Sequence, residues 1–166
     1  NKEKAVTALT KGIEFLFKKN KVTYFKGTGS FKGVNEISIL DEGKETTVQS
    51  NKIIISTGSN PVSIPGMEFD EEKILSSTGA LSLSKLPKKM VVVGGGYIGL
   101  EMGSVWSRLG TQVEVIEFLD HITPGMDIEV SREFEKILRK QGMKFQLNTK
   151  VEKITKNKNG VSIDTQ

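Results

Sequence analysis

The spacing of hydrophobic residues changes along the chain, and each change predicts a different kind of element. From Val6 to Phe17 an apolar residue recurs every three or four positions, which predicts an opening helix that ends near Asn20. Beyond it the pattern shifts to short alternating or β-branched runs, which predict an antiparallel meander without helices. The expected strands are 22–25, 29–31, 37–39, 46–48 and 52–55, with a turn at 41–44.

The segment 59–87 separates two differently patterned halves. It contains three of the four prolines, Pro61, Pro65 and Pro87. One short helix, 78–83, is expected inside an otherwise irregular crossover. Because proline-rich segments with little regular structure often join domains, a domain boundary is predicted near Pro87.

The second half alternates strands with helices, and this order predicts a parallel βαβαβ unit. Its first strand, 89–93, is an apolar run of the buried-strand type. The first helix ends at Gly110, and the second is capped by Asp127 and ends before Gly142. The other expected elements are strands at 113–118 and 144–147 and a hairpin of 151–154 with 161–163, and the apolar stripe of the first helix consists of Ile98, Met102, Val105, Trp106 and Leu109.

Between the first strand and the first helix lies a glycine-rich turn, residues 94–99, with the spacing G-x-G-x-x-G. Gly94 permits a sharp turn out of the strand, and Gly96, without a Cβ, lets a diphosphate approach the backbone. Gly99 lets the helix pack closely on the strand it has just left. Together with the free N–H groups at the start of the helix, this pattern predicts a dinucleotide-binding unit.

Glu117 lies at the end of the second strand of this unit, 18 residues beyond Gly99. In dinucleotide-binding domains an acidic residue near this distance accepts hydrogen bonds from the adenosine ribose. A carboxylate would repel the 2′-phosphate of NADP, and no Lys or Arg follows before Arg132. The sequence therefore favours NAD, although Glu117 could also be a solvated acid at the end of a strand.

Composition narrows the classes of function. With 36% hydrophobic and 27% charged residues, the chain has the composition of a soluble globular protein, and it contains no apolar run of membrane-spanning length. It has no cysteine, which excludes disulfides, thiolate metal sites and cysteine redox chemistry within these 166 residues. The net charge of +4 comes from scattered lysines, so neither nucleic acid nor membrane is an expected partner. The only histidine, His121, is interpreted as a loop residue, and no metal cluster or catalytic triad is apparent.

Several stretches carry a likeness to a known family: residues 91–106, 115–119, 125–127 and 138–151. They resemble the flavin-dependent pyridine nucleotide–disulfide oxidoreductases, and within that family the dihydrolipoamide dehydrogenases. The resemblance implies an α/β chain with part of an FAD/NAD(P)-binding Rossmann-like fold. Residues 1–87 would be the late, antiparallel part of an FAD-binding domain with its crossover, and 88–166 the N-terminal part of an inserted NAD-binding domain. The chain, which lacks an initiator Met, is thus expected to be an internal fragment.

The resemblance also assigns cofactor contacts. Gly29 would meet the adenine end of FAD, and Thr57, Gly58 and Ser59 match a second flavin-contact motif, in which Ser56 replaces the usual Ala. Each could instead be an ordinary strand or turn residue. The residues that would meet NAD are Gly94, Gly95, Gly96, Tyr97, Ile98, Gly99 and Glu101, with Ile98 and Glu101 nearest the nicotinamide, Tyr97 at a gating position, Glu117 on the ribose and Val151 on the adenine.

For the whole protein, the resemblance implies oxidation of dihydrolipoamide through a redox disulfide and FAD, with hydride passed to NAD⁺. The partners would be a lipoyl domain of a 2-oxoacid dehydrogenase or glycine cleavage complex and a second copy of the enzyme. The location would be the mitochondrial matrix in a eukaryote and the cytoplasm otherwise. The chain itself holds no catalytic residue and is expected to be inactive alone. The alternatives are another flavin-dependent disulfide or NADH oxidoreductase of the superfamily, such as an NADH oxidase, and a stand-alone NAD-binding module.

Overall fold

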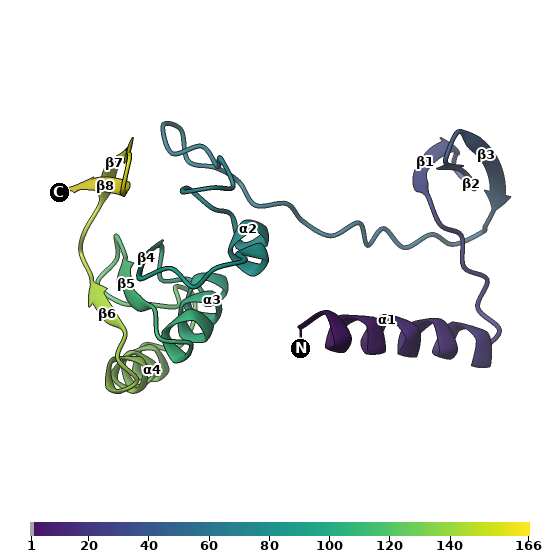
Figure 1. Ribbon diagram of the computed structural model, residues 1–166. Coiled ribbons are helices and arrows are strands. Elements are labelled where there is room, and N and C mark those ends of the chain that lie inside the picture. Colours follow the sequence, from purple (N-terminus) through teal and green to yellow (C-terminus); the bar gives the residue numbers. More distant parts are fainter. Residues whose placement is uncertain (1) are drawn as a thin grey trace. The chain divides into compact units, whose positions relative to one another are not determined.

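The computed structural model describes residues 2–166, which form two compact units (Figure 1). The first unit ends at Gly58 and the second is Ser59–Gln166. The segment 59–87 is grouped with the residues that follow it, and the domain boundary expected near Pro87 in a longer protein stays a prediction.

The first unit contains one helix and an antiparallel sheet. Helix α1 is Lys2–Lys19, and the strands β1 (Thr28–Gly33), β2 (Glu36–Asp41) and β3 (Lys44–Gln49) pair in chain order. The turn between β2 and β3 uses Glu42 and Gly43, both at positive φ. The predicted helix, its end and the central three strands of the predicted meander are thereby confirmed.

Two predicted strands, 22–25 and 52–55, are wrong, because both segments are irregular. A strand forms only where a neighbouring chain supplies hydrogen-bond partners, and the sheet of this unit ends at β1 and β3. Ile54 is 89% exposed, as expected for a segment that pairs with nothing in the described part of the unit. Helix α1 also buries no residue, so its apolar stripe faces outward.

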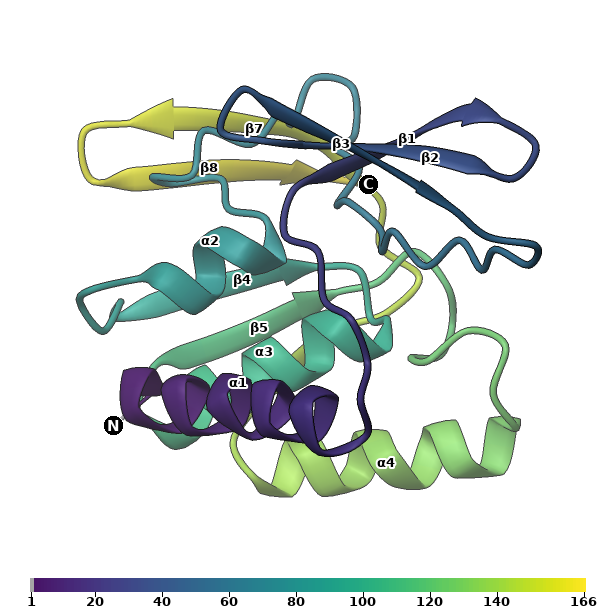
Figure 2. The same cartoon turned by 90° about the vertical axis from the view of Figure 1, so that its right-hand side faces the viewer.

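The second unit contains the predicted βαβαβ arrangement. Strands β4 (Lys89–Val93), β5 (Gln112–Ile116) and β6 (Lys144–Gln146) are parallel and lie in that order, connected by α3 (Tyr97–Arg108) and α4 (Ile128–Lys140). The hairpin of β7 (Val151–Asn157) and β8 (Gly160–Thr165) forms a separate two-stranded sheet (Figure 2). The short helix α2 is Ser77–Ser82. The elements expected from the sequence are therefore present.

Local signals fix the ends of the helices. The Asp127 side chain accepts hydrogen bonds from the N–H groups of Glu129 and Val130 and so caps α4. Gly110 and Gly142 follow α3 and α4 at φ 105° and 100°, a left-handed conformation that glycine adopts without strain.

Both helices pack on the same face of the parallel sheet. Leu100 of α3 and Leu138 of α4 join Val113 and Val115 of β5 in one buried cluster. The opposite face of β4 is open, with Val91 37% and Val93 39% exposed. The remaining members of the core cluster are Ile122, Met143 and Phe145.

Helix α3 packs only in part through the apolar stripe expected from its sequence, of which Trp106 lies against the buried core cluster. Its buried residues are Leu100 and Gly103, whereas Val105 is 43% and Leu109 58% exposed. Gly103 lies so close to the sheet that a Cβ there would stand 3.2 Å from Val113 Cγ1 of β5. The face of α3 that approaches the sheet most closely contains glycines, and the spacing of large apolar side chains does not reveal it.

Asp70 ties the crossover segment to the hairpin. Its Oδ1 accepts hydrogen bonds from the backbone N–H groups of Glu72, Lys73 and Ile74 at 2.8–2.9 Å, and Oδ2 lies 3.2 Å from Lys156 Nζ. The pKa of Asp70 is held well below its usual range by these backbone donors, of which the Ile74 N–H has the largest effect, and by the Lys156 ammonium. Since the folded pKa lies below the unfolded value, the contacts stabilise the fold above about pH 4, and this contribution is lost as the pH falls further.

The substitution Asp70→Asn is therefore expected to lower the melting temperature at pH 7, and to lower it by a smaller amount at pH 3, where the contribution of the charge is partly lost. Thermal unfolding of the full-length protein at both values measures the effect. Glu72→Gln is the matched control, because its carboxylate takes no part in these bonds. Equal losses for Asp70→Asn at the two pH values would show that the charge contributes nothing.

Candidate nucleotide-binding site

The glycine bend, residues 94–99, has the geometry that its sequence predicts. Gly94 turns the chain at φ 99°, and its N–H donates to Ile116 O at 2.8 Å. A Cβ at Gly99 would lie 2.8 Å from Val92 Cγ1 and 2.9 Å from Gly94 O, so only glycine allows α3 to pack this closely on β4. The turning role of Gly94 and the packing role of Gly99 are confirmed.

Gly96 is the N-cap residue of α3 and provides no side-chain cap. A Cβ built on it would meet no atom within 4 Å, so the protein itself leaves the space over Gly96 open. The first turn of α3 therefore presents its N–H groups and its positive dipole end to that space. Such an arrangement can hold an anion.

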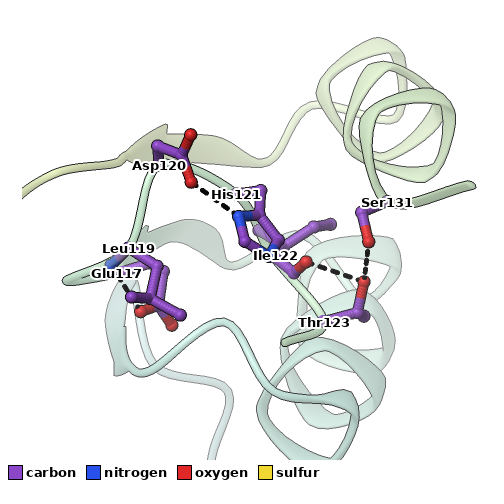
Figure 3. A network of polar contacts seen from close by, with 7 residues as sticks. All are labelled: Glu117, Leu119, Asp120, His121, Ile122, Thr123 and Ser131. Carbon is purple, nitrogen blue, oxygen red and sulfur yellow. Dashed lines mark hydrogen bonds and ion pairs between the residues drawn. The ribbon is translucent and has the colours of Figure 1, made fainter. Parts of the chain in front are cut away.

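Glu117 faces this bend from the end of β5. It is 7% exposed, and its Oε2 accepts a hydrogen bond from Gly95 N at 2.5 Å. Its Oε1 accepts one from Leu119 N at 2.8 Å (Figure 3). Each oxygen has a backbone donor, which offsets the cost of burying the charge and fixes the carboxylate beside Gly95.

The loop after Glu117 carries a second acid. Asp120 Oδ1 lies 2.6 Å from His121 Nδ1 (Figure 3). The hydrogen bond with His121, helped by the positive charge of Arg132, lowers the pKa of Asp120. His121 is thus a loop residue with an adjacent carboxylate, as the sequence suggested.

An open hollow of about 470 Å³ lies between the start of α3 and α4. Tyr97 and Glu101, one turn apart on α3, line it, whereas Ile98 is not among its lining residues. Its remaining walls are mostly apolar and come from the loop and from α4: Thr123, Met126, Val130, Glu133, Phe134 and Ile137. That Ile98 and Glu101 lie nearest the nicotinamide stays a prediction, because the lining of this hollow does not test it.

Val151 is the first residue of β7, and the segment just before it is hydrogen-bonded to the backbone of Glu117 and Leu119. Asn148 N donates to Leu119 O, and Thr149 N donates to Glu117 O, both at 2.9 Å. These bonds bring the segment before Val151 to the same end of the sheet as the bend.

The candidate flavin residues lie elsewhere along the chain. Gly29 is in β1 opposite Ile39, and Thr57 and Gly58 end the first unit in an irregular segment, with Gly58 at φ 78°. Ser59 opens the second unit. Their contact with flavin stays a prediction.

Two residues of the site were not predicted from the sequence. Thr123 is 5% exposed and Ser131 fully buried, and their hydroxyl oxygens lie 2.8 Å apart. Eight positions separate them, and no spacing rule joins a loop threonine to a helix serine. The one local signal is the Thr-Pro-Gly sequence at 123–125, which by itself indicates no more than a turn or loop.

Residues 2–166 lack two kinds of feature. None of the helices there is long and apolar enough to cross a membrane. The same residues contain no group of three or more His, Cys, Asp or Glu side chains placed to hold a metal ion.

Comparison with known proteins decides the family. The family model of the pyridine nucleotide-disulphide oxidoreductases matches residues 2–166. This chain belongs to that family. It is 55% identical to the mitochondrial dihydrolipoyl dehydrogenase of Pisum sativum, over 99% of this chain and 33% of that protein. The chain therefore spans about a third of the length of the curated oxidoreductases it matches.

Solved structures agree on the fold of these oxidoreductases. LpdA from Mycobacterium tuberculosis superposes with a TM-score of 0.84 at 22% identity, over 98% of this chain and 37% of its own. An engineered NADPH oxidase bound to NADPH, a mutant of the NADH oxidase of Lactobacillus brevis, gives 0.60 at 26% identity, over 79% and 31%. The predicted partial Rossmann-like α/β fold is confirmed.

Proposed function

We propose that the second unit binds NAD with its diphosphate at the glycine bend and its adenosine ribose on Glu117. The observation that carries this proposal is the buried Glu117 carboxylate, 2.5 Å from Gly95 N and beside the uncapped start of α3. A carboxylate there suits the two hydroxyls of a ribose and repels a 2′-phosphate. The other contacts would come from Gly94, Gly96, Tyr97, Ile98, Gly99, Glu101 and Val151.

The engineered oxidase supports the preference for NAD. The substitutions named for it change a glycine, an aspartate 18 positions later, the two residues after that aspartate, and a proline seven positions beyond it. Gly99, Glu117 and Pro124 stand at the same spacings in this chain. In the engineered protein the aspartate becomes alanine, and the proline and one neighbour of the aspartate become arginine. This chain keeps the acid and the proline, the pattern expected of an NAD site.

The first unit would contact FAD through Gly29, Thr57 and Gly58, continued by Ser59. A Cβ on Gly29 would meet only Ile37 Cγ2, at 3.7 Å, within the described residues, so a ligand could approach the strand there. Gly58 adopts φ 78°, which favours glycine at the end of this segment. The family description and the likeness over nearly the whole chain support FAD as the second cofactor.

The complete protein is proposed to be a dihydrolipoyl dehydrogenase. Identities of 52–55% to proteins of that name over at least 96% of this chain, in plants, a fungus, a slime mould and a bacterium, support this activity over that of an NADH oxidase. FAD and NAD would supply the electron and hydride transfer. The residues of this chain would bind and orient NAD: the first turn of α3 holds the diphosphate and Glu117 fixes the ribose.

The substrate and partners follow from that activity. The substrate would be dihydrolipoamide on a lipoyl domain of a 2-oxoacid dehydrogenase or glycine cleavage complex, and the enzyme would act as a homodimer. Relatives named as mitochondrial, together with a bacterial one, fit a matrix location in a eukaryote and a cytoplasmic one in a bacterium.

Steady-state assay of the full-length protein tests the proposal. Dihydrolipoamide should reduce NAD⁺ with formation of NADH at 340 nm, and NADP⁺ should react at least about a hundredfold more slowly, the usual scale of one charge repulsion in a binding site. Rapid oxygen consumption with NADH and no turnover of dihydrolipoamide would identify an NADH oxidase instead.

A further inference from the structure

Thr123 adopts a backbone conformation that its side chain disfavours. Its φ is 52°, in the left-handed region, although threonine is β-branched. It also precedes Pro124, whose ring further restricts the residue before it. Such a conformation persists only where the surroundings impose it, and residues of this kind are concentrated at functional sites.

The contacts that impose it are all polar and buried. Thr123 N donates to Gly95 O at 2.8 Å, and Thr123 Oγ1 donates to Ile122 O at 2.8 Å. With its proton used in that way, Oγ1 accepts a hydrogen bond from Ser131 Oγ at 2.8 Å (Figure 3). Ser131 is anchored in turn, because its N–H donates to the O of Asp127 at the start of α4.

Gly95 is the residue that both Thr123 and Glu117 bind. Its N–H is bound by Glu117, and its carbonyl by Thr123 N. Ile122 closes the third side, since its Cγ2 lies 3.1 Å from the place where a Cβ of Gly95 would stand. The middle of the glycine bend is therefore held between β5 and α4.

We propose that Thr123, fixed by Ser131, is a positioning residue for nucleotide binding. It holds Gly95 so that the N–H groups that follow in the bend and the Glu117 carboxylate already have their bound orientation before the nucleotide arrives. Affinity is then gained by preorganisation, because the bend does not have to be ordered on binding. This inference rests on the proposed NAD site.

The test uses three variants of the full-length protein: Thr123→Val, Ser131→Ala and the double variant. Thr123→Val keeps the β-branched shape and removes the hydroxyl. Without the hydrogen bonds of that hydroxyl, the backbone at this position is no longer held at its strained φ. Thr123→Val takes the partner away from the buried Ser131 hydroxyl, whereas Ser131→Ala leaves Thr123 Oγ1 its bond to Ile122 O. Both should lower the melting temperature, Thr123→Val by more. In the double variant both hydroxyls are gone, so most of that loss should be recovered.

Nucleotide binding should not recover with stability. We expect Kd for NADH and KM for NAD⁺ to rise roughly tenfold in Thr123→Val and to stay raised in the double variant, with kcat unchanged. Thr123→Ser, which keeps the hydroxyl, should bind NADH like the wild type.

Three results would overturn the inference. If affinity returns with the melting temperature in the double variant, the pair is a packing feature only. If the wild-type protein binds no NADH, the proposed NAD site fails and this inference fails with it. Tight wild-type binding with unchanged affinity in Thr123→Val would reject the positioning role alone.

Discussion

Replacing Glu117 by arginine is expected to lower the affinity for NADH by roughly ten- to a hundredfold, and to remove most of the preference for NADH over NADPH. The carboxylate is the group that would accept the ribose hydroxyls, and hydrogen bonds to a charged acceptor are the strong ones. An arginine removes that acceptor, and its positive charge attracts a 2′-phosphate. Titration of the full-length protein with each nucleotide measures both effects.

Two controls separate charge from architecture in this experiment. Glu117→Gln keeps an acceptor oxygen for a backbone N–H and removes the charge. The affinity for NADPH should therefore rise relative to that for NADH, while the fold is kept. Glu114→Gln removes a carboxylate from the same strand, where it accepts a hydrogen bond from Gln146 at 2.8 Å, and should change neither affinity. An unaltered NADH-to-NADPH ratio in Glu117→Arg would reject the ribose assignment.

Replacing Gly96 by aspartate is expected to change stability and binding in opposite directions. Gly96 has the extended backbone of an N-cap, φ −72° and ψ 164°, and open space around its Cβ position. Aspartate there should cap α3 and interact favourably with its dipole, a gain of about 0.3–1 kcal/mol in the free energy of unfolding. The same carboxylate would occupy the place of the diphosphate and repel it, lowering NADH affinity by about a hundredfold or more.

Calorimetric titration with NADH and thermal unfolding measure the two changes on one sample. Gly96→Asn is the matched variant: it caps the helix without a charge, so the difference in affinity between the two variants isolates repulsion from steric block. Retention of wild-type NADH affinity in Gly96→Asp would mean that the diphosphate lies elsewhere.

The elements of the second unit could be predicted because their ends carry local signals. Asp127 as a cap and Gly110 and Gly142 as terminators act within a few residues of chain, and the structure uses each of them in that way. The strands 22–25 and 52–55 failed for the opposite reason. Whether an extended segment becomes a strand depends on a neighbour, and hydrophobic spacing contains no information about that neighbour.

The part of the site that belongs to the glycine motif was predictable from the sequence. The glycine spacing and the distance to Glu117 follow from backbone geometry that every such bend must satisfy. The buried face of α3 was predicted only in part, because its buried residues Leu100 and Gly103 lie off the expected apolar stripe. Thr123 and Ser131 were missed because their pairing depends on the φ of one loop residue and on the packing of α4.

The most direct test of the NAD site is a structure of the full-length protein with NAD⁺ bound. The predicted result is a diphosphate about 3 Å from backbone nitrogens of the first turn of α3, with ribose hydroxyls on the Glu117 carboxylate and Gly95 still bound to Thr123 N. A nucleotide bound away from residues 94–99, or a Glu117 side chain turned from the ribose, would contradict it.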